Sequence, residues 1–147
     1  MPELVIMRGL SGSGKSTHIQ QHYPNHYVCS ADLFFEGLAD SQGTTYRDVF
    51  DPRLLPQAHA SCLREFILML DGVNDLVVDN TSSQKWEYEN YVLLAALAGY
   101  NVVIVEMPCR GFLDVKRYCE RSVHGAPMYA MEAMFERWEH DERAISP

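Results

Sequence analysis

The chain has 147 residues, 47% apolar and 22% charged, and its formal net charge is −8. This length is near the commonest domain size and predicts a single domain over residues 1–147, while the composition excludes a disordered chain. The acidic balance, with a sequence pI of about 5.1, argues against a broad surface that grips long nucleic acids. It leaves room for a short basic patch at one strand end or one nucleotide.

The start of the chain is unlike that of exported or membrane proteins. Residues 1–7 include an acidic residue and too few apolar residues for a signal peptide, and no apolar run reaches the roughly 18 residues that cross a bilayer. The four cysteines form no C-x-x-C pair, so no zinc site is expected. We expect a cytoplasmic protein without a membrane or an obligate protein partner.

Strands and helices alternate along the sequence. In chain order we expect a strand at 3–8, a helix at 16–22, a strand at 26–30, a loop with some helical turns at 36–51, a helix from Pro52, a strand at 76–79, a helix from Ser82 or Ser83 to about Ala98, a strand at 101–107, and helices at about 111–123 and 127–140. The apolar strands predict a parallel sheet covered on both faces. The expected fold is therefore a three-layer α/β sandwich of about four to five strands.

Apolar spacing predicts which helix faces are buried. Leu63, Phe66, Ile67 and Leu70 recur at one face of the helix that follows Pro52. In a parallel sheet ligands bind beyond the carboxyl ends of the strands. The chemistry is therefore expected at residues 9–15, 30–32, 79–81 and 108–110.

A glycine-rich segment follows the first strand. Residues 9–16, Gly-Leu-Ser-Gly-Ser-Gly-Lys-Ser, match G-x-x-x-x-G-K-[ST] at every fixed position. In this P-loop motif the backbone N–H groups and the following helix bind the β-phosphate, the lysine reaches the β- and γ-phosphates, and the hydroxyl ligates Mg²⁺. We predict a site for ATP, or another NTP, with Mg²⁺. Its residues are Gly9, Ser11, Gly12, Ser13, Gly14, Lys15, Ser16 and Thr17.

Two aspartates stand at expected strand ends. Asp79 closes a hydrophobic strand, where P-loop proteins place an acid associated with the metal; the alternative is a helix cap or turn residue. Asp32 follows the second strand by two residues. It either accepts a hydrogen bond from an acceptor hydroxyl or caps the next helix, and its position alone does not choose between the two.

Residues 110–126 form a basic segment in an acidic chain and predict a helical lid. Arg117 and Arg121, four residues apart, share one helix face, and they either clamp phosphates or pair with Asp114 and Glu120 in solvent. The P-loop favours the clamp. In the loop before Pro52, Arg47 and its neighbour Tyr46 are candidates for contact with the acceptor.

Five segments together resemble the small P-loop kinases related to the kinase half of bacteriophage polynucleotide kinase. They are residues 8–17, 30–35, 56–59, 78–81 and 121–127. The resemblance implies that Asp32 is the general base on the acceptor hydroxyl and Arg121 the lid arginine on the transferring phosphate. It also implies that Lys15 and Ser16 hold phosphates and Mg²⁺, that Asp79 helps organise the acceptor site, and that Arg117 is a second lid arginine.

The predicted reaction is transfer of the γ-phosphate of ATP to a hydroxyl. Members of the resembled family mostly act on the 5′-hydroxyl of DNA or RNA, and some phage relatives act on a hydroxymethylated DNA base. A nucleic-acid end or modified nucleotide is therefore the first acceptor hypothesis. A small-molecule or nucleotide-sugar kinase is the second, and a nucleotide-gated binding module with slow hydrolysis is the third.

Overall fold

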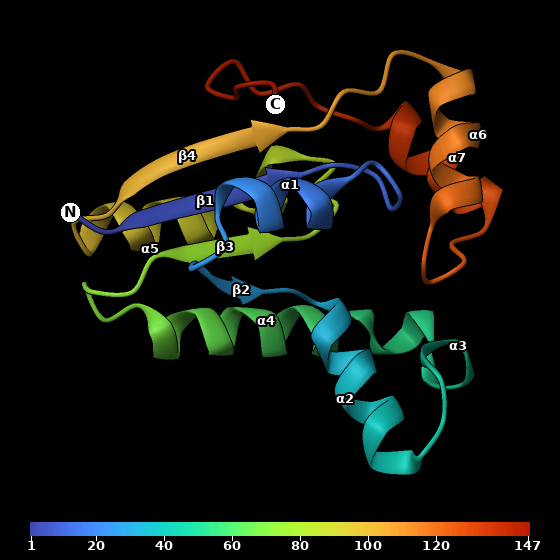
Figure 1. Ribbon diagram of the computed structural model, residues 1–147, viewed down its shortest axis with the longest axis horizontal. Helices are drawn as coiled ribbons and strands as arrows, with labels where there is room; N and C mark the ends of the chain where they lie inside the picture. The colour runs from blue at the N-terminus through green and yellow to red at the C-terminus, as the bar shows by residue number, and fades with distance from the viewer.

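The computed structural model describes residues 1–147 and contains one parallel sheet. Its strands are β1 (Glu3–Arg8), β2 (Tyr27–Cys29), β3 (Leu76–Asp79) and β4 (Asn101–Glu106), in the order β2-β3-β1-β4 (Figure 1). All pairs are parallel, with Ile6 opposite Val78 in β3 and Ile104 in β4. The four strands expected from their apolar runs are confirmed, and the carboxyl ends of all four point the same way.

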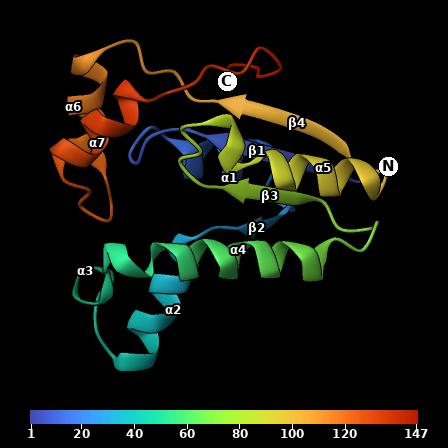
Figure 2. The ribbon, with the colours of Figure 1, turned by 180° about the vertical axis from the view of Figure 1, so that it is seen from behind.

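Helices cover both faces of the sheet. They are α1 (Lys15–His22), α2 (Asp32–Gln42), α3 (Tyr46–Val49), α4 (Leu55–Met69), α5 (Glu89–Leu97), α6 (Phe112–Arg121) and α7 (Met128–Glu136), with short 3₁₀ helices at Pro52–Leu54 and Lys85–Glu87. In Figure 1, helix α1 lies in front of the sheet and α5 lies behind it, and in Figure 2, seen from the other side, α5 lies in front.

The alternation of side chains along β1 explains these layers. Leu4 and Ile6 pack in one cluster with Phe66 of α4 and Tyr91 of α5, whereas Val5 and Met7 pack in a second cluster with Ile19 of α1. Successive residues of a strand point to opposite faces. The expected three-layer α/β fold is therefore present, with an apolar core on each side of the sheet.

The segment expected to be a loop with some turns is mostly helical. Helix α2 runs to Gln42, because Phe35 and Ala39, four residues apart, are buried in a cluster of their own. Gly43, at φ 66°, ends the helix in the left-handed conformation, in which glycine is favoured. The prediction gave too much weight to the glycines and too little to this apolar spacing.

Two further expectations about helices are corrected. The buried face of α4 is formed by Ala58, Cys62 and Phe66, and Ile67 is 52% exposed. After β3, α5 begins at Glu89 because a 3₁₀ turn precedes it, in which Gln84 and Glu87 cap each other. The predicted serine cap is therefore absent.

Helices α6 and α7 form a pair at the carboxyl end of the sheet (Figures 1 and 2). Val115 and Tyr118 of α6 and Met131 of α7 enclose Leu10 of the glycine-rich loop in a small core. This pair contains the predicted lid. No helix has the length and apolar composition needed to cross a membrane.

A buried arginine of β1, Arg8, binds the segment that follows α7. Arg8 is 0% exposed, and its guanidinium donates to carbonyls of Ser82, Ser83 and Glu139 and pairs with Glu106 at 2.5 Å. The same group lies 4.7 Å from the ring centroid of Trp138. A buried charge needs such partners, so Arg8 joins β1, β4 and the segment after α7.

Candidate active site

The glycine-rich loop turns directly from β1 into α1. Gly14 precedes the helix with φ 98°, and Lys15 and Ser16 are its first two residues. The Lys15 amine donates to the carbonyl of Gly9 at 2.6 Å, while Ser16 and Thr17 are exposed. The loop thus presents a lysine, a hydroxyl and a helix N-terminus together, which is the arrangement that binds phosphate groups.

Lys15, Asp79 and Asp32 interact electrostatically. Burial lowers the pKa of Lys15, and the charges of Asp79 and Asp32 oppose that shift. Burial also raises the pKa of Asp79, with Lys15 acting in the opposite direction. The strand ends and the glycine-rich loop thus bring together three residues separated by up to 64 positions in the sequence (79 − 15).

Two buried polar atoms at this site have no hydrogen-bond partner in the protein. They are Oδ1 of Asp79 and Oγ of Ser13. An unpartnered buried carboxylate oxygen is costly unless a ligand satisfies it. Asp79, with the Ser16 hydroxyl, therefore fits Mg²⁺, which is commonly held by one or two protein oxygens, waters and substrate phosphates. No group of three or more His, Cys, Asp or Glu side chains surrounds a metal position, so the phosphates would complete the shell.

Asp32 is the first residue of α2, and its amide donates to the Ser30 hydroxyl at 3.2 Å, so the side chain of Asp32 itself does not cap the helix. Its carboxylate is instead 52% exposed and accepts a hydrogen bond from the Tyr46 hydroxyl at 2.7 Å. Asn80 accepts a hydrogen bond from the Ala31 amide at 2.9 Å and so ties the end of β3 to this turn. Of the two roles left open by the sequence, the structure disfavours the cap.

The carboxyl end of α6 rests on the glycine-rich loop. Ser122 and Ser11 share a hydrogen bond of 2.6 Å between their hydroxyls. A Cβ atom at Gly12 would overlap the carbonyl oxygen of Tyr118 and lie 3.2 Å from the Ser122 nitrogen. The predicted lid therefore contacts the glycine-rich loop through its backbone and a serine.

The two arginines of the predicted lid face solvent. Arg117 and Arg121 are both exposed. Arg117 lies 3.8 Å from Asp114, and the Arg121 guanidinium lies 5.1 Å from the Tyr118 ring centroid. Arg117 thus makes the solvent pairing that the sequence offered as the alternative to a phosphate clamp, and neither arginine has a hydrogen bond or ion pair to the glycine-rich loop or to Asp32.

The region around Asp32 joins the predicted acceptor candidates Tyr46 and Arg47 to His124 and Gly125, which follow α6. The His124 ring stacks on Tyr46 with centroids 3.8 Å apart, and its Nε2 atom is 3.6 Å from Glu36. The Arg47 guanidinium packs against Gly125, since a Cβ there would lie 2.8 Å from its Cζ. The sequence named Tyr46 and Arg47 as candidates but not these pairings, because the contacts join residues about 80 positions apart.

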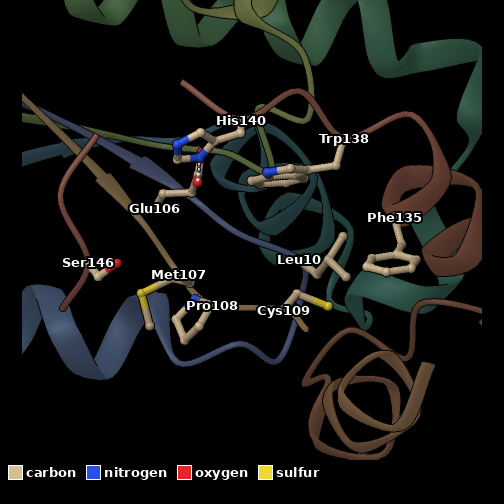
Figure 3. Close-up of a pocket in the computed structure, with 9 residues that line it drawn as sticks. All are labelled: Leu10, Glu106, Met107, Pro108, Cys109, Phe135, Trp138, His140 and Ser146. Carbon is tan, nitrogen blue, oxygen red and sulfur yellow. Dashed lines mark hydrogen bonds and ion pairs between the residues drawn. The ribbon is translucent and has the colours of Figure 1, made fainter. Parts of the chain in front are cut away.

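A cavity of about 250 Å³ opens on the β4 side of the glycine-rich loop. Figure 3 shows Leu10, Cys109 and Phe135 together at one end, and Glu106 hydrogen-bonded to His140 beside the ring of Trp138. Met107, Pro108 and Ser146 complete the lining. The sequence pointed to residues 108–110 but not to the contribution of the segment after α7.

Residues 4–141 match the family described as AAA domain. The chain belongs to this family. Human NEDD4-binding protein 2 is 29% identical to this AAA domain over 147 residues, or 97% of the chain. The chain spans only 8% of that relative's length.

Solved structures share the fold of this AAA domain. Kti12 of Chaetomium thermophilum, in complex with ADP-AlF₃, superposes with a TM-score of 0.70 at 15% identity, over 98% of this chain and 88% of that one. The APS kinase CysC of Mycobacterium tuberculosis, in complex with AMPPNP and APS, gives 0.62 at 19%, over 99% and 88%. A gluconokinase of Sinorhizobium meliloti gives 0.62 at 18%, over 99% and 81%. The chain therefore has a P-loop kinase-like fold.

Proposed function

We propose that this protein is an ATP- and Mg²⁺-dependent kinase that transfers the γ-phosphate to a hydroxyl group of a nucleic acid. The acceptor is a 5′-hydroxyl of DNA or RNA, or a hydroxymethylated base in DNA. The observation that carries the proposal is the exposed carboxylate of Asp32, held by Tyr46 within electrostatic reach of Lys15. A protein that only binds nucleotides needs no carboxylate there, whereas a kinase needs one to accept the acceptor's proton.

The strand order indicates on which side of the glycine-rich loop the base of the nucleotide would lie. In the order β2-β3-β1-β4, the glycine-rich loop after β1 lies between Asp32, beyond β2, and the cavity beside β4. In-line transfer requires the γ-phosphate to face the acceptor, so the base extends toward β4. We therefore assign the cavity, with its apolar lining and aromatic rings, to the nucleobase.

Each residue then has a defined part in the transfer. The amides of the glycine-rich loop and Lys15 bind the phosphates. Asp32 accepts the proton of the acceptor hydroxyl while the hydroxyl oxygen forms a bond to the γ-phosphorus. The bond from that phosphorus to the bridging oxygen breaks, and ADP leaves. Arg121 and Arg117 approach the transferred group from the lid and stabilise its charge. Ser16 and Asp79 would hold Mg²⁺, which would supply positive charge to the phosphates.

Aromatic and cationic groups beside Asp32 support a nucleic-acid acceptor. Phe50, Tyr46 and His124 form a stacked column, with ring centroids 5.7 Å and 3.8 Å apart. Arg47 lies on the same short helix as Tyr46. Nucleobases stack on aromatic rings, and guanidinium groups bind phosphates, so this small surface suits a strand end or a single nucleotide.

A small-molecule or nucleotide-sugar acceptor is the second candidate. The net charge of −8 favours an acceptor without a long phosphate backbone. The gluconokinase and the APS kinase share this fold. With either acceptor, a cytoplasmic location is consistent with the four cysteines, which are all free thiols, because disulfides are rare in that compartment.

Transfer of label from γ-labelled ATP tests the proposal. Acceptors are matched 5′-hydroxyl DNA and RNA oligonucleotides, DNA with a hydroxymethylated base, and a panel of nucleosides and sugar nucleotides. Asp32→Asn is expected to spare ATP binding and to reduce transfer by about 100-fold or more, whereas Asp40→Asn, on the exposed face of the same helix, serves as the matched control. Label on small acceptors alone would select the second candidate. Slow ATP hydrolysis that Asp32→Asn leaves unchanged would favour a binding module.

A further inference from the structure

The end of the lid docks on the acceptor side of the site through one stacked pair of rings. His124 follows α6 by three residues, and its ring lies 3.8 Å from that of Tyr46 with an angle of 20° between the planes. The two residues come from segments 78 positions apart (124 − 46). Stacking of this kind fixes both rings, because each loses the freedom to rotate.

The same pair surrounds the carboxylate of Asp32. The Tyr46 hydroxyl donates to Oδ1 at 2.7 Å, and His124 Nε2 lies 3.7 Å from Oδ2. Burial and the hydrogen bond to Asp32 raise the pKa of Tyr46, so its hydroxyl keeps the proton that it donates. One oxygen of the carboxylate is therefore engaged by a fixed donor, and the other faces the lid.

The docking also sets the position of the rest of the lid. Ser122, two residues before His124, bonds to Ser11 of the glycine-rich loop. Gly125, one residue after it, packs against Arg47. Arg121 is thus followed at once by a segment that is fixed both to the P-loop and to α3.

We propose that Tyr46 and His124 are positioning residues that couple closure of the lid to the orientation of Asp32. This inference rests on the proposed kinase function. When His124 stacks on Tyr46, the lid closes over the site, and Asp32 presents Oδ2 to the acceptor hydroxyl. When the stack opens, the lid leaves, and Asp32 loses its orientation. The closed lid then both excludes water and allows phosphate transfer, which limits hydrolysis of ATP.

Three variants of the full chain separate the two contacts. Tyr46→Phe keeps the stack and removes the hydroxyl. His124→Phe keeps a stacked ring and removes Nε2, and His124→Ala removes both. His59→Ala on α4 and Tyr129→Phe on α7, both at exposed residues, are the matched controls. Thermal unfolding of each variant identifies any that fails to fold.

Kinetics and hydrogen exchange read out the coupling. Loss of the hydrogen bond to a charged carboxylate is expected to lower kcat for transfer by about 10- to 100-fold in Tyr46→Phe, with the Kd for ATP within about twofold. His124→Ala is expected to raise the ratio of hydrolysis to transfer and to increase amide exchange in residues 118–126. His124→Phe, which keeps the stack, should restore both the protection of the lid and the wild-type ratio.

Distinct results overturn the inference. Unchanged exchange of the lid in His124→Ala would show that the pair does not dock it, and a loss of transfer explained wholly by weaker ATP binding would assign both residues to the nucleotide site. If the wild-type chain transfers phosphate to no acceptor, the proposed function fails. The exchange experiment then still decides whether the stacked pair holds the lid.

Discussion

Replacing Gly12 by alanine tests the contact between the lid and the glycine-rich loop. Gly12 has φ 79°, and an added Cβ would overlap the Tyr118 carbonyl oxygen and lie 2.9 Å from its carbonyl carbon. The atom that must move is backbone at the end of α6. A flexible side chain could turn aside, but this helix end cannot move without displacing the lid.

The magnitude follows from two separate costs. A left-handed conformation costs alanine about 1–2 kcal/mol relative to glycine, and overpacking of a close contact adds about 1–3 kcal/mol. Gly43 supplies the matched control, since its φ is 66° and no atom lies within 4 Å of an added Cβ. Gly43→Ala should therefore show the first cost alone, and Gly12→Ala the sum, about 2–5 kcal/mol.

Urea denaturation measures the free energy of unfolding, and hydrogen exchange locates the change. We expect Gly12→Ala to raise amide exchange in residues 112–126 while the exchange of β1 and β3 follows global stability. If the lid separates without unfolding, its exchange rises and the global loss stays near that of Gly43→Ala. Equal losses in the two variants together with an unchanged lid would refute the contact.

Three further substitutions test other parts of the molecule. Burial raises the pKa of Asp79, so the ionised carboxylate destabilises the fold. The stability of Asp79→Asn relative to the wild type should therefore increase as the pH rises from about 4, where the unfolded aspartate becomes ionised, towards 7, and pH-dependent denaturation measures this difference. Arg8→Met should cost about 3–5 kcal/mol in urea denaturation, since it removes the buried cation that pairs with Glu106 and leaves the carbonyls of Ser82, Ser83 and Glu139 without this donor. Cys109→Trp should fill the cavity beside β4 and weaken ATP binding by about tenfold, or roughly 1.4 kcal/mol, in calorimetry. Inorganic triphosphate, which has no base, should bind as it does to the wild type. Equal losses of affinity for both ligands would show that the base does not bind in that cavity.

The fold was largely predictable because its signals are local. The P-loop motif occupies consecutive residues, and the apolar runs that became β1 and β3 are buried on both faces of a parallel sheet, while the run in β4, at the edge, buries Ile104 and Val105. Such runs need no knowledge of distant residues. Strand positions therefore agreed closely with expectation, whereas helix boundaries, which depend on capping and packing, did not.

The parts that escaped prediction depend on contacts between distant segments. Tyr46 approaches Asp32 only because Phe35 packs α2 against α3. Arg8 reads from the sequence as the exposed end of a strand, yet it is buried by a segment more than 130 residues later. Ile67 follows a helical apolar spacing and still faces solvent, since no element covers that side of α4. Periodicity shows that a face is apolar but does not show what packs on it.

The segment after α7 has a consequence for how far the folded unit extends along the chain. The family match stops at residue 141, but the amide of Ile145 donates to Ile104 and its carbonyl accepts from Glu106, extending the β4 edge of the sheet. Unpaired strand edges invite association with other chains. A fragment trimmed to residue 141 would therefore retain every P-loop residue and yet expose this edge, so its aggregation could be mistaken for a defect of the active site.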